Sequence, residues 1–357
     1  MIEQRPDLAR TQRAGRSAPA SPRLDGAVRV RRQAVDEANR GGRGYSDSAA
    51  RSVTAAGRLA LVSVGAAIGA AVPYALTVGT RAGQLVGELI LGGRPPGLEQ
   101  VAAAQSVLAN VSRTSLALGT IAIVAIALLQ RRRRLAVVAL VAVIGANLTT
   151  QLLKEVVLDR TDLLEGLFYP LPNSFPSGST TAAASIAVGL LLVLPPLLRA
   201  PVVVLSAAIV AVVGVSTLVA GWHRMADAIG GAFVATCWGA GLASVLAWRR
   251  GVEIVGRRTA ELGRLGASIP IALGTGMVFL GALAYLIVVI DPLQVLEYLA
   301  ERGGSPALFG LGAVIIAGAS LLSLGALGLA LREVRLDPRP SGQAAPPDGD
   351  ESGNSSD

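Results

Sequence analysis

Long apolar segments dominate the sequence between Leu59 and Leu331 and leave few folds open to it. Each segment is about 16–24 residues long, and a helix that rises 1.5 Å per residue needs about 20 residues to cross the hydrocarbon core of a bilayer. In that core an open strand would leave backbone N–H and C=O groups without partners. The segments therefore predict an all-α fold, a polytopic membrane helical bundle.

We expect eight transmembrane helices, of which the second is short. They lie near residues 58–78, 115–130, 135–153, 180–198, 202–221, 227–248, 268–290 and 309–331. Hydrophobic residues make up 52% of the 357-residue chain and charged residues only 16%. An average soluble domain has about 25% charged residues. The composition therefore argues against a soluble globular or nucleic-acid-binding protein.

Polar segments divide the chain into five predicted parts. These are a disordered, Arg-rich tail (1–56), a six-helix core (57–249), a basic linker (250–267), two additional transmembrane helices (268–334) and a second disordered tail (335–357). The tails have no sustained apolar period, which is typical of disorder. The single cysteine, Cys237, excludes an internal disulfide.

The basic residues predict the orientation in the membrane. If the N-terminal tail is cytoplasmic, 25 of the 32 lysines and arginines lie on the cytoplasmic side and 7 on the outer side. An excess of basic residues inside is the general rule for membrane proteins. We therefore expect a multi-pass protein of the cytoplasmic membrane, with both termini in the cytoplasm.

Within the hydrophobic region, the polar residues that could carry chemistry gather at one membrane face. Lys154, the only lysine, and Arg160 follow the third predicted helix, and residues 176–179 (Pro-Ser-Gly-Ser) lead into the fourth. His223, the only histidine, and Asp227 lie at the start of the sixth. By the predicted topology, all of these segments are at the outer ends of their helices.

These residue types suit phosphate chemistry. The backbone N–H groups of Ser177, Gly178 and Ser179 lie at the predicted N-terminus of a helix. Such a terminus binds anions with the help of the helix dipole. Lys154 and Arg160 would add positive charge. One histidine, one cysteine and scattered carboxylates do not form a zinc site, so we expect no metal and no cofactor.

His223 can attack phosphorus, and Asp227, one helical turn later, can fix the tautomer of the imidazole. Each candidate residue also has a purely structural interpretation. A lysine at a helix end can extend its ammonium to the interface, and Asp227 can cap its helix. These interpretations do not explain why the residues gather on one face in this order.

The three segments resemble the motifs of the type-2 phosphatidate phosphatase superfamily, which shares its helical core with the vanadium haloperoxidases. That family carries Lys, six residues and Arg-Pro, then Pro-Ser-Gly-His, then Ser-Arg, five residues, His, three residues and Asp. The third motif is present here with the same spacing, from Ser216 and Thr217 to His223 and Asp227. The resemblance covers residues 58–249.

Three departures from the motifs are visible. The first motif has five residues between Lys154 and Arg160, and no proline follows. The second ends in Ser179 where the family has histidine, and the third has Thr217 where the family has arginine. Arg224 is a candidate for restoring the positive charge that Thr217 lacks.

The resemblance implies that His223 is the nucleophile that forms a phosphohistidine and that Asp227 orients it. It also implies phosphate binding by residues of the first two motifs, namely Lys154, Arg160, Ser177 and Gly178. The expected function is that of an integral-membrane lipid phosphatase acting on the outer face. The alternatives are a catalytically degenerate relative that binds phospholipid headgroups and a transporter. A transporter is disfavoured because the ionisable residues lie at helix ends and not near the midplane.

The residue at position 179 suggests a preference among lipid substrates. A phosphate monoester expels an alkoxide, whose conjugate alcohol has a pKa near that of water, about 15–16, and serine is a poor source of the proton that this group needs. A diphosphate expels a phosphate monoester, whose second pKa is about 6. The sequence therefore favours a polyprenyl diphosphate as substrate over phosphatidate.

Overall fold

The computed structural model describes residues 49–95, 97–165, 172–290 and 304–338. The chain divides into a unit of residues 1–49 and a unit of residues 50–357. All helices and strands from residue 50 onward belong to the second unit. The predictions of disordered tails fall outside the described residues over 1–48 and 339–357.

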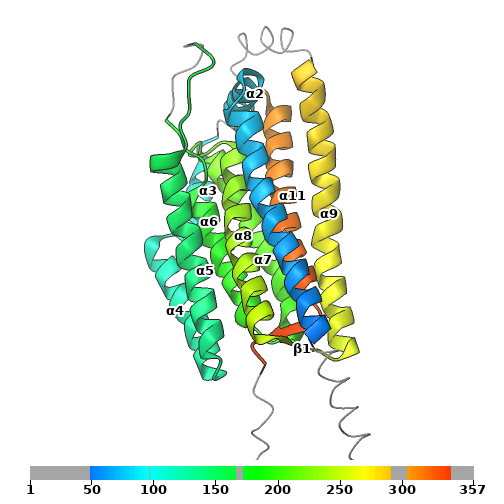
Figure 1. The fold of residues 1–357 in the computed structure, drawn as a ribbon. Helices are drawn as coiled ribbons and strands as arrows, with labels where there is room; N and C mark the ends of the chain where they lie inside the picture. Colours follow the sequence, from blue (N-terminus) through cyan, green and yellow to red (C-terminus); the bar gives the residue numbers. More distant parts are fainter. Residues whose placement is uncertain (1–48, 96, 166–171, 291–303, 339–357) are drawn as a thin grey trace, which may run out of the picture. The chain divides into compact units, whose positions relative to one another are not determined.

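The described residues form a helical bundle with one small sheet (Figure 1). A first helix over residues 49–73 continues into a π-helical turn, η1 (Tyr74–Val78). The other helices are α2 (Arg81–Gly92), α3 (Leu98–Ala109), α4 (Arg113–Leu129), α5 (Arg133–Leu152), η2 (Leu153–Val157), α6 (Gly178–Val193), α7 (Pro196–Val219), α8 (Met225–Arg250), α9 (Arg257–Ile290) and α11 (Pro306–Leu331). The strands are β1 (Val252–Ile254) and β2 (Val334–Leu336).

The all-α, multi-pass class is confirmed. Within the described residues, six helices are long and apolar enough to cross a membrane, and the pair α3 and α4, bent by 44°, would make a seventh. The 16-residue helix α6 is apolar but shorter than the length of about 20 residues that spans a bilayer. Each of the eight predicted segments overlaps one of these helices, but the predicted segment 180–198 runs past the end of α6 at Val193 into the start of α7.

Three regions differ from the expectations. Residues 49–56, assigned to the tail, begin the first helix, and the segment between the first two spans contains α2 and α3. The expected linker 250–267 forms β1 and the first turns of α9. There the side chains of Arg257 and Glu261 pair at 2.8 Å one helical turn apart, a contact that supports a helix outside the apolar region.

Helix α6 forms the centre of the six-helix core. It packs against α4, α5, α7 and α8, and most of its residues are buried. A helix that is apolar on every side is stable only when other helices surround it. Because α6 begins at Gly178, this packing fixes the position of the motif that precedes it.

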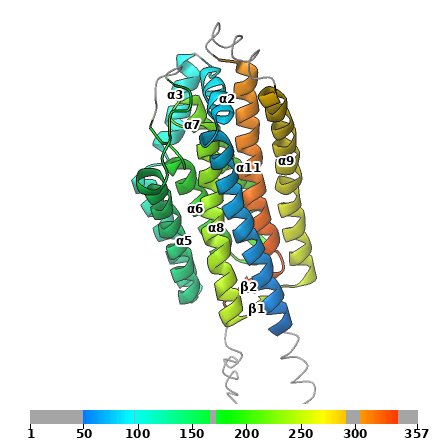
Figure 2. The same cartoon turned by 45° about the horizontal axis from the view of Figure 1, so that its top comes forward.

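The two ends of the bundle differ in structure (Figures 1 and 2). We call the end with α2, the loop before α6 and the turn between α7 and α8 the site end. At the other end, the strand end, β1 pairs antiparallel with β2, with Val252 opposite Leu336. Helix α8 has 26 residues and runs from the site end to the strand end, about 39 Å at 1.5 Å per residue.

Candidate active site

A tight turn between α7 and α8 positions His223. Gly221 has a φ of 73°, a left-handed conformation that glycine adopts without steric cost. The backbone N–H groups of Trp222 and His223 donate to the carbonyl oxygen of Thr217 at 3.0 and 3.3 Å. These bonds end α7 and hold the imidazole two residues before the start of α8.

The carboxylate of Asp227 gathers three donors around one oxygen. Its Oδ2 accepts hydrogen bonds from the backbone N–H of Arg224 at 2.9 Å and from the hydroxyl of Ser174 at 2.5 Å. The same oxygen lies 3.3 Å from Nδ1 of His223. Asp227 thus caps α8 and also lies within reach of the imidazole, so one side chain makes both contacts. With the proton on Nδ1, the Nε2 atom keeps a lone pair for attack.

Two arginines share a second carboxylate at the site end. Oε1 of Glu88, in α2, accepts hydrogen bonds from Nη2 of Arg160 at 2.9 Å and from Nε and Nη2 of Arg224 at 2.8 and 2.6 Å. All three side chains are more than nine-tenths buried. Burial and the positive charge of Arg224 lower the pKa of Arg160. Two guanidiniums on one carboxylate leave an excess of positive charge.

The segment before α6 contacts the first turns of α8. The backbone N–H of Ser177 donates to the carbonyl oxygen of Asp227 at 2.8 Å. A Cβ atom on Gly231 would lie 2.7 Å from the carbonyl oxygen of Ser177, so glycine is required for this close approach. The Ser177 N–H, expected to bind phosphate, is therefore used between helices. The N–H groups of Gly178 and Ser179 have no partner inside the helix.

Lys154 lies in η2, directly after α5, one turn beyond a contact between α5 and α6. One turn earlier, the hydroxyl groups of Thr150 and Thr181 are 2.9 Å apart, so this face of α5 packs on α6. The side-chain amide of Asn173 donates to the Lys154 carbonyl oxygen at 3.2 Å. Among the described residues, the Lys154 ammonium has no hydrogen-bond or ion-pair partner.

Thr217 and Ser179, which replace an arginine and a histidine of the family motifs, differ in their surroundings. Thr217 is fully buried, and its hydroxyl donates to the carbonyl oxygen of Gly214 in its own helix, so it does not take the place of an arginine. Ser179 is half-buried in the first turn of α6. Nη1 of Arg224 lies 3.4 Å from the Ser174 hydroxyl that bonds to Asp227, so Arg224 brings positive charge to the histidine–aspartate pair.

Three residues of the site were not predicted. They are Glu88, Ser174 and Gln84, and Gln84 lies one turn before Glu88 in α2. The Gln84 side chain donates to the Thr161 carbonyl oxygen at 2.7 Å and accepts from the Leu163 N–H at 3.2 Å. These bonds hold the segment that carries Arg160. In the sequence, Gln84 and Glu88 stand four residues apart in an otherwise apolar segment, and polar residues in such a segment indicate a functional site.

Fold and site together define a class: a multi-pass helical membrane protein with a buried histidine–aspartate pair beside two arginines at one end. In the comparison with protein families, residues 135–251 of the 357-residue chain match the model of the PAP2 superfamily. The resemblance to the type-2 phosphatidate phosphatases is thereby confirmed, and at the level of the family it supports phosphatase activity. The matched region runs from α5 to the end of α8 and contains all three motifs. No curated protein and no solved structure matches the chain.

Proposed function

We propose that this protein is a lipid phosphatase that hydrolyses a lipid phosphate or diphosphate through a phosphohistidine on His223. The observation that carries the proposal is the contact between Nδ1 of His223 and the buried Asp227 carboxylate at 3.3 Å. This contact leaves Nε2 as the nucleophile. It is the arrangement of a nucleophile with an orienting group that covalent catalysis needs.

The reaction has two displacements at phosphorus. First, the Nε2 lone pair of His223 forms an N–P bond while the P–O bond to the leaving group breaks and its electrons stay with the leaving oxygen. Water then attacks phosphorus, the N–P bond breaks, and inorganic phosphate departs with the oxygen of the water. The imidazole recovers its lone pair, so the enzyme returns to its starting state.

Phosphate binding is proposed for the groups around His223. Arg160 and Arg224 are held by Glu88, and fixed guanidiniums bind phosphate oxygens without the entropy cost of ordering them. The free N–H groups of Gly178 and Ser179 add donors at the start of α6. Lys154, in η2 directly after α5, would supply a further charge.

Protonation of the leaving group is the step for which this site lacks an evident donor among the described residues. His223 is the only histidine in the chain, and Ser179 occupies the family's second histidine position. Glu88 accepts three hydrogen bonds from guanidinium N–H groups, so it serves as an acceptor there and not as a proton donor. We therefore propose a lipid diphosphate, such as a polyprenyl diphosphate, as the preferred substrate.

We further propose that the protein lies in the cytoplasmic membrane with the site end outside. The asymmetry of 25 to 7 basic residues supports this orientation. Reporter fusions at the C-terminus and in the segment 79–114 would test it. The C-terminal fusion should give a cytoplasmic signal, and a periplasmic-type signal from it would contradict the orientation.

The test of the proposed function is a hydrolysis assay with purified protein in detergent. Wild type should release phosphate from polyprenyl diphosphate faster than from phosphatidate, and His223→Ala should release none from either. If wild type hydrolyses neither lipid but binds both, the protein is a headgroup-binding relative of the phosphatases. Full activity in His223→Ala would exclude the proposed mechanism.

A further inference from the structure

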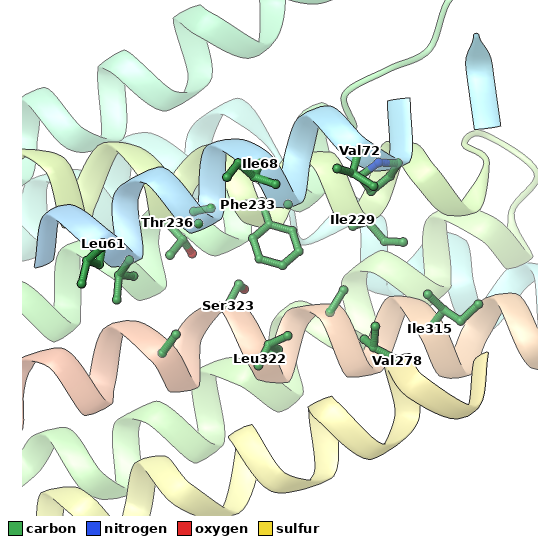
Figure 3. Close-up of a pocket in the computed structure, with 17 residues that line it drawn as sticks. Leu61, Ile68, Val72, Ile229, Phe233, Thr236, Val278, Ile315, Leu322 and Ser323 are labelled. Carbon is green, nitrogen blue, oxygen red and sulfur yellow. The ribbon is translucent and has the colours of Figure 1, made fainter. Parts of the chain in front are cut away.

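An apolar groove of about 650 Å³ lies between the first helix, α8, α9 and α11 (Figure 3). Its lining includes Gly65 and Ile68 of the first helix, Phe233 of α8, Val278 of α9 and Ala319 of α11. Binding sites for small molecules commonly have volumes of about 300–1,000 Å³. The groove lies within four candidate membrane spans, so its surroundings are the bilayer interior.

Three helices line both this groove and a small cavity beside Arg224 and Asp227. On α8, Phe233 and Ile229 line the groove, and Met225, four residues before Ile229, lines a small cavity of about 10 Å³. Arg224 and Asp227 line the same small cavity. Residues four apart lie on one face of a helix, so one face of α8 leads from the groove to the small cavity beside Asp227, whose Oδ2 lies 3.3 Å from Nδ1 of His223.

The first helix and α9 show the same continuity. Pro73 lines the groove, and Thr77, four residues later, lines the small cavity. Val278 of α9 lines the groove, and Tyr285, two turns later, lines the small cavity. Apolar faces on three helices thus end at the same place, beside Arg224 and Asp227.

We propose that this groove binds the hydrocarbon tail of the substrate lipid while its phosphate lies at His223. The inference rests on the proposed function and assigns a role to α9 and α11, which lie outside the family match at residues 135–251. From Leu61 to Pro73 the first helix covers 13 residues and rises about 18 Å at 1.5 Å per residue, a length that suits part of an extended lipid chain. The tail passes from the apolar bilayer interior to an equally apolar wall, so its binding rests on packing against the groove and not on the hydrophobic effect.

A second groove of about 470 Å³ lies beside the first helix, with Ala71, Leu153 and Trp238 in its lining. It is lined by the first helix, α5, the residues around η2 and α8, and its lining, like that of the first groove, does not include Arg224 or Asp227. This groove is the competing location for the tail, and the experiment below separates the two.

The groove can be filled by one substitution. A Cβ atom on Gly65 would meet nothing within 4 Å, so Gly65→Phe adds a ring to the groove without a backbone clash. Gly57→Phe is the matched control, because Gly57 lies on the same helix, also has nothing within 4 Å, and does not line the groove. Ala71→Phe fills the second groove.

Hydrolysis of a 55-carbon polyprenyl diphosphate is compared with that of isopentenyl diphosphate, which has almost no tail. Gly65→Phe should lower kcat/KM at least tenfold for the long substrate and leave the short one within twofold of wild type. Gly57→Phe should match wild type on both. An equal loss on both substrates, no loss on either, or a tail-specific loss only in Ala71→Phe would overturn the proposal.

A second readout does not depend on turnover. Full-length protein with His223→Ala is irradiated with a phosphatidate that carries a diazirine in its acyl chain, and cross-links are mapped by mass spectrometry. Labels should fall in residues 61–73 and 315–326 and should be displaced by excess unlabelled phosphatidate. If these labels are found but the wild-type protein hydrolyses neither lipid, the proposed function is refuted and the groove is kept. Equal labelling by a diazirine diacylglycerol, or labels confined to the second groove, would refute the groove.

Discussion

At the strand end of the bundle, the buried Arg199 donates through Nη1 to the carbonyl oxygens of Leu331 and Val334, at 3.0 and 2.6 Å. Arg132, also buried, donates to the carbonyl oxygen of Leu336. At the site end, Arg160 and Arg224 instead share the carboxylate of Glu88. These two buried guanidiniums of the strand end bond to backbone carbonyl groups, whereas the two buried guanidiniums of the site end bond to one carboxylate.

Arginine therefore has a different role at each end of the bundle. Carbonyl groups at the end of α11 and in β2 need donors, because a buried acceptor left without a hydrogen bond costs about 1–3 kcal/mol. The arginines of the strand end therefore contribute to stability. At the site end, Arg224 pairs with Glu88, and its Nη1 lies 3.4 Å from the Ser174 hydroxyl; the role that we propose for Arg160 and Arg224 is binding of an anionic ligand.

The largest expected effect concerns the histidine–aspartate pair. Asp227→Asn keeps the shape of the side chain but allows the wrong imidazole tautomer, so kcat should fall by about two to four orders of magnitude, by analogy with the aspartate of hydrolase triads. Kinetics on a lipid diphosphate measure the change, and thermal unfolding controls for folding. A folded variant with kcat within threefold of wild type would remove Asp227 from the mechanism.

A pair of arginine variants tests the comparison between the two ends. Arg224→Ala should lower kcat/KM about 10- to 100-fold, since a hydrogen bond to a charged group contributes about 1.5–3 kcal/mol. Arg199→Ala should lower the melting temperature, because two carbonyl groups lose their donor, and should keep kcat/KM within twofold in the folded protein. The reverse pattern would show that the assigned roles are wrong.

The missing histidine of the second motif gives the next prediction. A general acid contributes about 10²–10⁴-fold where the leaving group needs a proton, and a grafted imidazole should recover part of this. Ser179→His should raise phosphatidate hydrolysis at least tenfold and change diphosphate hydrolysis less than threefold. The ratio of the two rates in one preparation is the measurement. An equal gain on both substrates would refute the leaving-group explanation.

The smallest expected effect is at the strand end, where Nη1 of Arg58 donates to Oε2 of Glu333 at 2.6 Å. This hydrogen bond lowers the pKa of Glu333 below its usual value. The stabilisation is therefore present above the unfolded pKa of about 4.3 and is lost as the pH falls through the lower folded value. Both side chains are partly exposed, so the contribution should stay below about 1 kcal/mol.

Melting temperatures of wild type and Arg58→Ala measure this effect. The variant should melt slightly below wild type at pH 7, and the difference should shrink as the pH falls below about 4 and Glu333 takes up a proton. A difference that persists or grows in acid would show that Arg58 acts by packing and not through its charge.

Much of the fold could be predicted because crossing a bilayer requires long apolar helices, and such segments are visible in the sequence. The helices α2 and α3 and the strands β1 and β2 could not, because they are short and are stabilised by contacts with distant segments. Arginine counts predicted an orientation, yet the roles of Arg132 and Arg199 depend on carbonyl groups about 130 to 200 residues further along the chain. Those contacts leave no local signal.

The site was predicted where chemistry requires fixed spacing. His223 and Asp227 lie four residues apart, so one helical turn brings them together, and the interval is visible in the sequence. Glu88 lies 136 residues before Arg224, and Ser174 lies 53 before Asp227. Such pairs depend on how α2 and the loop before α6 pack against α8, which no interval in the sequence specifies.

The most direct test of the central claim is to isolate the covalent intermediate. Purified protein is mixed for milliseconds with polyprenyl diphosphate labelled with ³²P at the terminal phosphate, quenched in alkali, which preserves phosphohistidine, and digested for peptide mapping. A phosphohistidine mechanism predicts label on the peptide that contains His223 in wild type and none in His223→Ala. Rapid hydrolysis by wild type with no label on that peptide, or label that persists in His223→Ala, would contradict it.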